Sequence, residues 1–328
     1  MTKKILVWLL VTLFVVNVCV AQAQQPTKIP RIGYLALASL SALSARIEFF
    51  RQGLRELGYV EGKNIVIEFR SANGKLDRLP ALAAELVRLK VDIIVTPGAP
   101  VTRAAKEATV TIPIVMTQVG DPVASGFVSS LARPGGNITG LSTLAPELWG
   151  KRLELLKEIV PRLTRVAVFG TSTTPDNAPS LKEVELAAKA LKVKLQFLDV
   201  LDPKDIETAF RAASKGRAEA VLMMVPGGIA GAHRTQIADL AVKSRLAVIY
   251  GGRGSVEAGG LVSYGVNVND LDRRAATYVD KILKGRTPAD LPVEQPMKFE
   301  FIINLKAAKA IGLTIPPNVL VRADKVIR

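Results

Sequence analysis

From Arg31 onward, short runs of β-branched and apolar residues alternate with longer stretches of helical periodicity. The alternation runs twice in succession, and the turn-forming segment 133–137 interrupts it near the end of the first set. Parallel strands need long crossover connections, which are usually helices, so this pattern is typical of parallel sheets with helices on both faces. The sequence therefore predicts an α/β fold with two Rossmann-like, doubly wound parallel-sheet lobes.

The expected elements can be placed along the chain from periodicity and from turn residues. In the first set we expect strands at 31–37, 64–70, 92–95, 112–116 and 138–141, and helices at 45–57, 80–90 and 99–108. In the second set we expect strands at 165–169, 194–198, 220–224 and 247–250, and helices at 146–160, 178–191, 203–215 and 233–244. The tail adds strands at 260–266 and 298–303 and helices at 271–283 and 305–311.

The tail is expected to supply elements to both sets. We therefore expect one lobe from 30–143 plus 266–296, and the other from 146–263 plus 299–328. The chain would then cross between the lobes near 142–145, 264–268 and 296–299. Several crossings form a hinge with one soft bending mode, and such a hinge suits a cleft that closes on a ligand.

Residues 1–23 have the layout of a secretory signal peptide, with an early pair of lysines, an apolar run and small residues before the expected cut. The apolar run falls short of the roughly 20 residues that a membrane span needs, although an uncleaved anchor is the alternative. We expect a mature chain that starts near Gln24 and is exported to the periplasm. Lipid attachment at Cys19 is less favoured, because Val18 is larger than the small residue expected there.

The composition argues against several classes of chemistry. Cys19 is the only cysteine and lies in the leader, which excludes disulfides, thiolate metal sites and cysteine nucleophiles from the mature chain. His233 is the only histidine, and no Gly-x-Ser-x-Gly elbow or Walker loop is present. We therefore expect no catalytic residues, no metal site and no cofactor. The formal charge is +15, but cations and acids are interspersed and aromatics make up only 5%, so we expect no nucleic-acid partner.

Ligands of open α/β sheets bind beyond the carboxyl ends of the strands. The loops at these ends carry hydroxyl, glycine, amide and charged residues that could contact a solute. The candidate ligand-binding residues are Ser39, Ser41, Ser44, Thr96, Gly98, Ala99, Gln118, Asp121, Thr171, Asn177, Pro226, Gly227, Gly252 and Arg253.

Most of these candidates also have a purely structural interpretation. The serines suit a helix cap, and Gly98 suits a turn. The helix start near Ala99 could instead offer free N–H groups to a carboxylate. Asp121 fits either the ammonium group of a ligand or a turn before Pro122, and Arg253 fits either a ligand carboxylate or a solvated rim. Tyr34 and Tyr250 could flank an aromatic or planar ligand, although the mid-strand position of Tyr34 favours core packing.

Four stretches resemble a signature of one family of solute-binding proteins. They are FRQGLRELGYVEGKN at 50–64, DPV at 121–123, LARPGGNITG at 131–140 and GKRLELLK at 150–157. The family is that of ABC-transporter substrate-binding proteins similar to the tryptophan-binding lipoproteins, and the resemblance covers nearly the whole mature chain. It implies a type I periplasmic-binding fold with the ligand held between two lobes. The chain departs from the lipoprotein members because it lacks a clean lipobox at Cys19.

The resemblance implies an exported, non-enzymatic receptor, and we expect it to work as a monomer. It would bind a small organic solute and deliver it to an ABC permease in the inner membrane. The best-studied members bind aromatic amino acids, so we expect an amino acid, while a nucleobase, a small amide or an aromatic acid remains open. The alternatives are a periplasmic sensory binding protein that serves a chemoreceptor or kinase, and an exported α/β enzyme.

Overall fold

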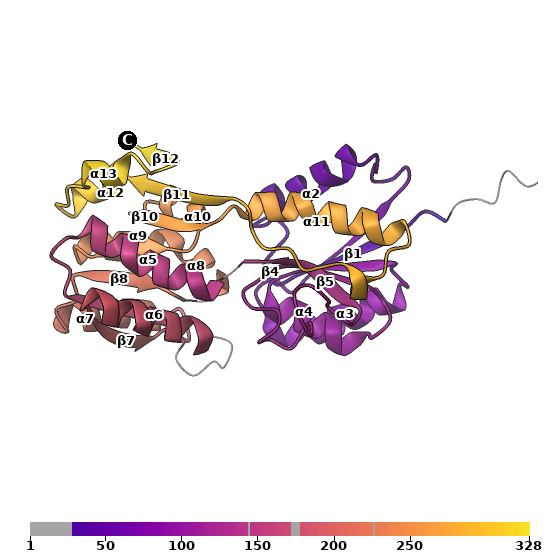
Figure 1. Cartoon of the computed structure of the whole chain (residues 1–328), viewed down its shortest axis with the longest axis horizontal. Coiled ribbons are helices and arrows are strands. Elements are labelled where there is room, and N and C mark those ends of the chain that lie inside the picture. Colours follow the sequence, from indigo (N-terminus) through magenta and orange to yellow (C-terminus); the bar gives the residue numbers. More distant parts are fainter. Residues whose placement is uncertain (1–27, 144, 172–177, 226) are drawn as a thin grey trace, which may run out of the picture.

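The computed structural model describes residues 28–143, 145–171, 178–225 and 227–328. They form two α/β lobes that lie side by side along the long axis of the molecule (Figure 1). The predicted fold class is confirmed. None of the helices in the described ranges combines the length and the hydropathy that a membrane span requires.

Lobe 1 is built on a parallel sheet that, in the described residues, has five strands in the order β2-β1-β3-β4-β5. Its strands are β1 (Arg31–Ala36), β2 (Val66–Ser71), β3 (Ile93–Pro97), β4 (Ile114–Val119) and β5 (Ile138–Ser142). Its helices are α2 (Ser44–Glu56), α3 (Leu79–Arg88), α4 (Ala99–Ala108) and α11 (Val268–Leu283), with the short turns η1 (Leu76–Arg78) and η3 (Pro288–Asp290). Figure 1 shows α2 and α11 side by side on one face of this sheet.

Alternate residues of β1 explain why helices cover both faces of the lobe 1 sheet. Ile32 and Tyr34 pack into the cluster formed with α2 and α11, whereas Leu35 packs into the cluster formed with α3 and α4. Burying a large apolar side chain of this kind contributes about 1.5–3 kcal/mol. Gly53 sets the contact between α2 and α11, because a Cβ at this position would collide with the backbone carbonyl of Arg273.

Lobe 2 is built on a sheet whose described strands number seven, in the order β12-β11-β10-β9-β8-β6-β7. They are β6 (Arg165–Gly170), β7 (Lys194–Asp199), β8 (Ala220–Met223), β9 (Ala247–Tyr250), β10 (Val262–Val266), β11 (Phe299–Asn304) and β12 (Lys325–Ile327). The neighbouring strands from β7 to β10 run parallel, as expected. The tail strand β11 runs antiparallel to β10, because the chain returns from lobe 1 before entering it.

The helices of lobe 2 also cover both faces of its sheet. They are α5 (Ala145–Ile159), α6 (Ala178–Leu191), α7 (Asp205–Lys215), α8 (Gly227–Ala232), α9 (Arg234–Lys243), α10 (Arg253–Glu257), α12 (Leu305–Ala310) and α13 (Pro317–Leu320). The sequence did not predict α8, α10, α13 or β12. Each is too short for hydrophobic periodicity to be recognised in it.

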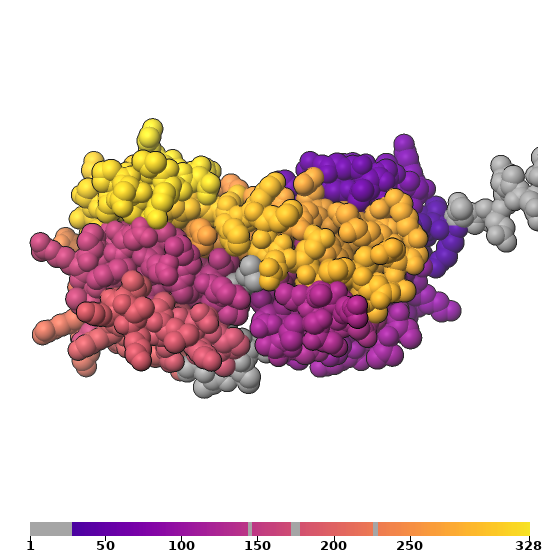
Figure 2. All heavy atoms as spheres, viewed as in Figure 1, coloured from indigo at the N-terminus to yellow at the C-terminus, as the bar shows by residue number. Residues whose placement is uncertain are grey.

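The described chain passes between the two sheets three times: from β5 to α5, from β10 to α11, and from η3 to β11. Strand β5 leaves lobe 1 at its carboxyl end, and β10 leaves lobe 2 at its carboxyl end. Because the neighbouring strands run parallel to these two, the carboxyl edges of both sheets face each other. On the face that Figure 2 shows, the molecular surface narrows between the two lobes.

Candidate functional site: the cleft between the two lobes

The loop after β1 contributes three of the candidate serines on the lobe 1 side of the cleft. The Ser39 hydroxyl lies 3.1 Å from that of Ser41 and accepts the backbone N–H of Ala42 at 3.3 Å. Ser44 is exposed and begins α2, but no described side chain caps this helix. Ser39 therefore stabilises the turn, while Ser41 and Ser44 lie exposed at the start of the helix.

The start of α4 contributes Thr96, Gly98 and Ala99. Gly98 has φ 95° and ψ 156°, a conformation that glycine adopts readily and other residues rarely do, and its N–H bonds to the carbonyl of Thr117 at 2.7 Å. Thr96 is fully buried, with its hydroxyl 2.9 Å from that of Thr102, so it belongs to the core of the lobe. Ala99 is half-buried at the first helical position. Pro100 follows it and removes one N–H donor from the helix start.

The end of β4 contributes Gln118 and Asp121. Gln118 has a positive φ of 59° and lies at a register shift between β4 and β5. Such strained backbone positions cluster at functional sites. Asp121 is half-buried, and its Oδ1 atom accepts the backbone N–H groups of Val123 at 3.0 Å and Ala124 at 2.9 Å. Asp121 therefore caps this turn, and its Oδ2 atom has no hydrogen-bond partner among the described residues.

A buried ionic network lies beneath this edge of lobe 1. Asp272 of α11 accepts hydrogen bonds from Arg46 Nε at 2.7 Å and Gln118 Nε2 at 3.1 Å. The hydroxyl of Thr117 lies 3.5 Å from the same carboxylate. Burial lowers the pKa of the Arg46 guanidinium, but the adjacent Asp272 carboxylate outweighs burial and holds the pKa above its ordinary value. Burial and the nearby carboxylate both raise the pKa of the Tyr34 hydroxyl, which is buried and has no partner in the described part of the chain.

The lobe 2 side of the cleft contributes the remaining candidates. Thr171 is buried directly after β6, and Gly227 begins α8. Gly252 is the N-cap of α10. Asn177 and Pro226 lie outside the described residues.

Arg253 is already paired with acids of its own lobe. Its Nε and Nη2 atoms donate to Glu257 Oε1 at 3.2 and 2.9 Å, and Nη1 lies 3.5 Å from Glu300 Oε1. The hydrogen bond to Glu257 holds the pKa of Arg253 above its ordinary value. The side chain is 41% exposed, so the rim interpretation describes its position better than that of a carboxylate receptor.

A buried arginine, which sequence reasoning missed, lies where lobe 2 meets the hinge. Arg152 of α5 is 4% exposed, and its Nε donates to the backbone carbonyl of Tyr264 at 2.6 Å. Its guanidinium carbon lies 4.0 Å from the ring centroid of Trp149. Burial lowers the pKa of Arg152 to about 9. In the sequence this arginine stands beside Lys151 on an amphipathic helix, where a cation is usually solvated.

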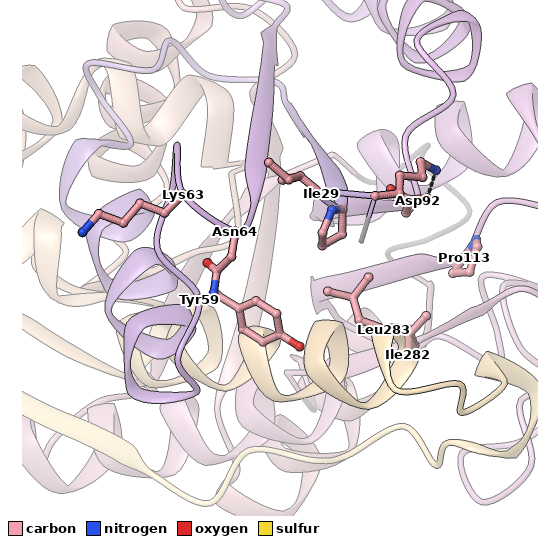
Figure 3. Close-up of a pocket in the computed structure, with 10 residues that line it drawn as sticks. Ile29, Tyr59, Lys63, Asn64, Asp92, Pro113, Ile282 and Leu283 are labelled. Carbon is pink, nitrogen blue, oxygen red and sulfur yellow. Dashed lines mark hydrogen bonds and ion pairs between the residues drawn. The ribbon is translucent and has the colours of Figure 1, made fainter. Parts of the chain in front are cut away.

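An open depression of about 680 Å³ lies at the opposite end of lobe 1 (Figure 3). Its wall includes Pro30, Asp92 and Pro113, which precede β1, β3 and β4, so it lies at the amino ends of the strands. Figure 3 shows Ile282 and Leu283, from the end of α11, on another side of it. Because ligands of such sheets bind at the carboxyl ends, we do not assign the solute site to this depression.

Within the described ranges, no three histidine, cysteine or carboxylate side chains gather where they could hold a metal ion.

A family model described as "ABC transporter substrate binding protein" matches residues 31–327. The chain belongs to this family. The resemblance to tryptophan-binding members that the sequence predicted is confirmed by the relatives of this chain. It is 27% identical over 282 residues to a tyrosine-binding protein of Clostridioides difficile (strain R20291), covering 86% of this chain and 81% of that protein.

Two solved structures of relatives cover nearly the whole chain at 26% identity. An ABC domain from Streptococcus pneumonia in complex with L-Trp has a TM-score of 0.83 over 91% of this chain and 99% of its own. The ligand-free, open structure of a substrate-binding protein with adhesive properties from Clostridium difficile has a TM-score of 0.70 over 92% of this chain and 99% of its own. At equal sequence identity, the backbone of this chain as a whole matches that of the ligand-bound relative more closely.

Proposed function

We propose that this protein is an exported receptor of an ABC uptake system that binds an aromatic amino acid between its lobes and delivers it to an inner-membrane permease. The observation that carries the proposal is the match to relatives that bind tyrosine and tryptophan, each aligned over more than four-fifths of the chain. The absence of a metal cluster from the described residues is compatible with a binding role, but the proposal does not depend on it.

The hinge supports a mechanism of lobe closure. The two carboxyl edges face each other across three connections, counted over the described chain, so a bend at the connections would change the distance between the edges. A solute that contacts both edges favours the closed form by no more than the difference between its affinities for the two forms. Among the relatives, one structure holds L-Trp and another is described as ligand-free and open, which supports an open form within the family.

The roles of individual residues are part of the proposal. On lobe 1, Ser41, Ser44 and the N–H of Ala99 would contact the solute, with Gln118 beside them. The free Oδ2 atom of Asp121 would pair with the ammonium group. On lobe 2, the candidates after the strands are Thr171, Asn177, Pro226, Gly227 and Gly252.

The proposal is tested with protein expressed with its own leader and purified from the periplasm. The intact mass shows whether the chain is cut before Gln24. Thermal unfolding is then followed with L-tyrosine, L-tryptophan, L-leucine, L-glutamate, adenine and spermidine. A solute present at about 100 times its dissociation constant adds roughly 2.7 kcal/mol of stability, and we expect this effect from an aromatic amino acid. A shift with another solute alone would show that the ligand is wrongly assigned.

A further inference from the structure

Arg152 is a buried cation without a counter-charge. It is 4% exposed, and none of the carboxylates in the described part of the chain lies within ion-pair distance of it. The carbonyl of Tyr264 satisfies Nε, but no described acceptor bonds to Nη1 or Nη2. Nη1 and Nη2 are not among the fully buried atoms that lack a partner, so they keep a narrow contact with solvent. A charge that is largely removed from water without a partner is still costly, and proteins normally pair it. The lowered pKa of Arg152, about 9, expresses the same cost.

The two unpaired nitrogens lie at the edge of lobe 2 that faces lobe 1. A Cβ built on Gly251 would lie 3.4 Å from Nη2 and 3.6 Å from the guanidinium carbon of Arg152. Gly251 directly follows β9, at its carboxyl end. A Cβ on Gly265 of β10 would also lie 3.4 Å from Nη2. Both are ordinary van der Waals distances, so the unpaired end of the guanidinium lies directly beside the backbone of β9 and β10 at this edge. At Gly265 a Cβ would collide with the carbonyl oxygen of Gly251, which by itself requires glycine there.

The remaining contacts of Arg152 fix its orientation. Trp149 stacks on the guanidinium plane, and the bond from Nε to Tyr264 holds one edge of it. Tyr264 packs against the apolar clusters of both lobes, which places this edge at the hinge. An arginine held in this way presents Nη1 and Nη2 as a fork, the arrangement that binds a carboxylate bidentately.

We infer that Arg152 binds the carboxylate of the solute, so that the bound ligand supplies the counter-charge that the protein itself lacks. The inference rests on the proposed receptor function and adds to it the residue that recognises the carboxylate of the amino acid. Opening at the hinge admits the solute, and closure removes the ion pair from water, where a charged hydrogen bond is stronger than at an exposed site.

The test compares acids with their amides on three proteins. L-Tyrosine, L-tyrosinamide, L-tryptophan and L-tryptophanamide are titrated by calorimetry into the wild type, Arg152→Gln and Lys151→Gln. The control variant removes an exposed cation from the adjacent position of the same helix, where it pairs with Glu154. We expect the wild type to prefer the acid, and Arg152→Gln to lose roughly 30- to 1,000-fold in affinity for the acid. Affinity for the amide should change less than threefold, and the control should match the wild type.

A second variant and a second signal separate recognition from folding. Arg152→Lys keeps the charge but loses the fork, so we expect it to bind the acid with intermediate affinity. The chain has two tryptophans, and after removal of the leader only Trp149 remains. Its emission, excited where tyrosine does not absorb, should change when L-tyrosine binds and should respond far less to the same concentration of L-tyrosinamide.

The outcomes distinguish this inference from the proposed function. If Arg152→Gln weakened acid and amide equally, Arg152 would be a structural tie between α5 and β10, and the inference would be wrong while the receptor function stood. Equal binding of acid and amide by the wild type would have the same meaning. If only solutes without a carboxylate bound, both the inference and the amino-acid assignment would be wrong. If no solute of the panel bound, the proposed function would fail together with the inference.

Discussion

Two arginines flank the cleft, the partly exposed Arg46 and the buried Arg152, and only one of them is paired with an acid. In lobe 1, Arg46 is paired with Asp272 at 2.7 Å, and the same carboxylate accepts a hydrogen bond from Gln118. At the lobe 2 side of the hinge, Arg152 contacts the ring of Trp149 and the backbone carbonyl of Tyr264, but it pairs with no acidic side chain among the described residues. Burial lowers the pKa of both, yet only at Arg46 does a neighbouring carboxylate reverse the effect.

The difference separates a structural charge from one that is held ready for a ligand. The pair of Arg46 and Asp272 joins α2 to α11, two helices on the same face of lobe 1, so its charges are balanced inside the fold. Arg152 contacts the hinge strand β10, and its charge is balanced only if something else enters. The following predictions test this comparison in order of expected stability change.

Arg46→Met should cause the largest loss of stability, about 3–5 kcal/mol, because it leaves the Asp272 carboxylate buried without its partner. Chemical denaturation measures the change in the free energy of unfolding. Arg55→Met is the control, because Arg55 is on the same helix and its ion pair with Glu48 is exposed. The double variant Arg46→Met/Asp272→Leu should recover most of the loss. If the single variant were as stable as the control, the pair would not be structural.

Gly53→Ala should cost about 1–3 kcal/mol, because the new Cβ forces α2 away from the carbonyl of Arg273. The displacement would also lengthen the contact between Arg46 and Asp272. Thermal unfolding measures the loss of stability. Gly58→Ala is an unsuitable control, because Gly58 has a positive φ that alanine rarely adopts. Gln52→Ala, on the exposed side of the same helix, is the better reference. An unchanged midpoint for Gly53→Ala would show that the helices can separate without cost.

Arg152→Met should destabilise the ligand-free protein by no more than about 1.5 kcal/mol, clearly less than Arg46→Met. The variant loses the hydrogen bond to Tyr264, but it also removes an unpaired buried charge, and the two effects oppose each other. The free energies of unfolding of the two variants are compared in the same buffer without solute. A loss of 3 kcal/mol or more, roughly the effect of breaking a buried pair, would mean that Arg152 already has a partner.

Asp121→Asn should change stability least, by a few tenths of a kcal/mol, because the amide oxygen can still accept the N–H groups of Val123 and Ala124. Asp121→Ala removes the acceptor and should cost about 1 kcal/mol. If Asp121 also pairs with the ammonium group, Asp121→Asn should bind L-tyrosine about 10- to 100-fold more weakly. Calorimetry measures the affinity of the variant and of the wild type for L-tyrosine. Equal affinities would show that Asp121 only caps the turn.

The sequence predicted the fold well because the fold depends on local patterns. The expected bounds of α4, α6 and β9 agree with the structure residue for residue. Gly98 and Pro100 mark the start of α4, Pro179 marks the start of α6, and Gly251 follows β9. The parallel, doubly wound arrangement follows from the alternation itself. The antiparallel direction of β11 could not be predicted from the alternation, because it depends on which lobe the chain comes from when it enters this strand.

The site was harder to predict because its contacts join distant positions. Asp272 stands in a charged segment, 270–274, that resembles a solvated helix surface, and its partner Arg46 is 226 residues away. Arg152 is likewise next to exposed Lys151, and the carbonyl that it contacts is 112 residues away. Sequence spacing cannot show that Asp272 and Arg152 are buried. It also could not show that Glu257 and Glu300 occupy the Arg253 guanidinium.

The most direct test of this account is a crystal structure of the protein in complex with L-tyrosine. We predict that the ligand carboxylate lies about 2.7–2.9 Å from Nη1 and Nη2 of Arg152, with Nε still bonded to Tyr264 and Arg46 still bonded to Asp272. A complex in which the lobes enclose L-tyrosine but its carboxylate is bound elsewhere, with Nη1 and Nη2 of Arg152 still unpaired, would contradict the account.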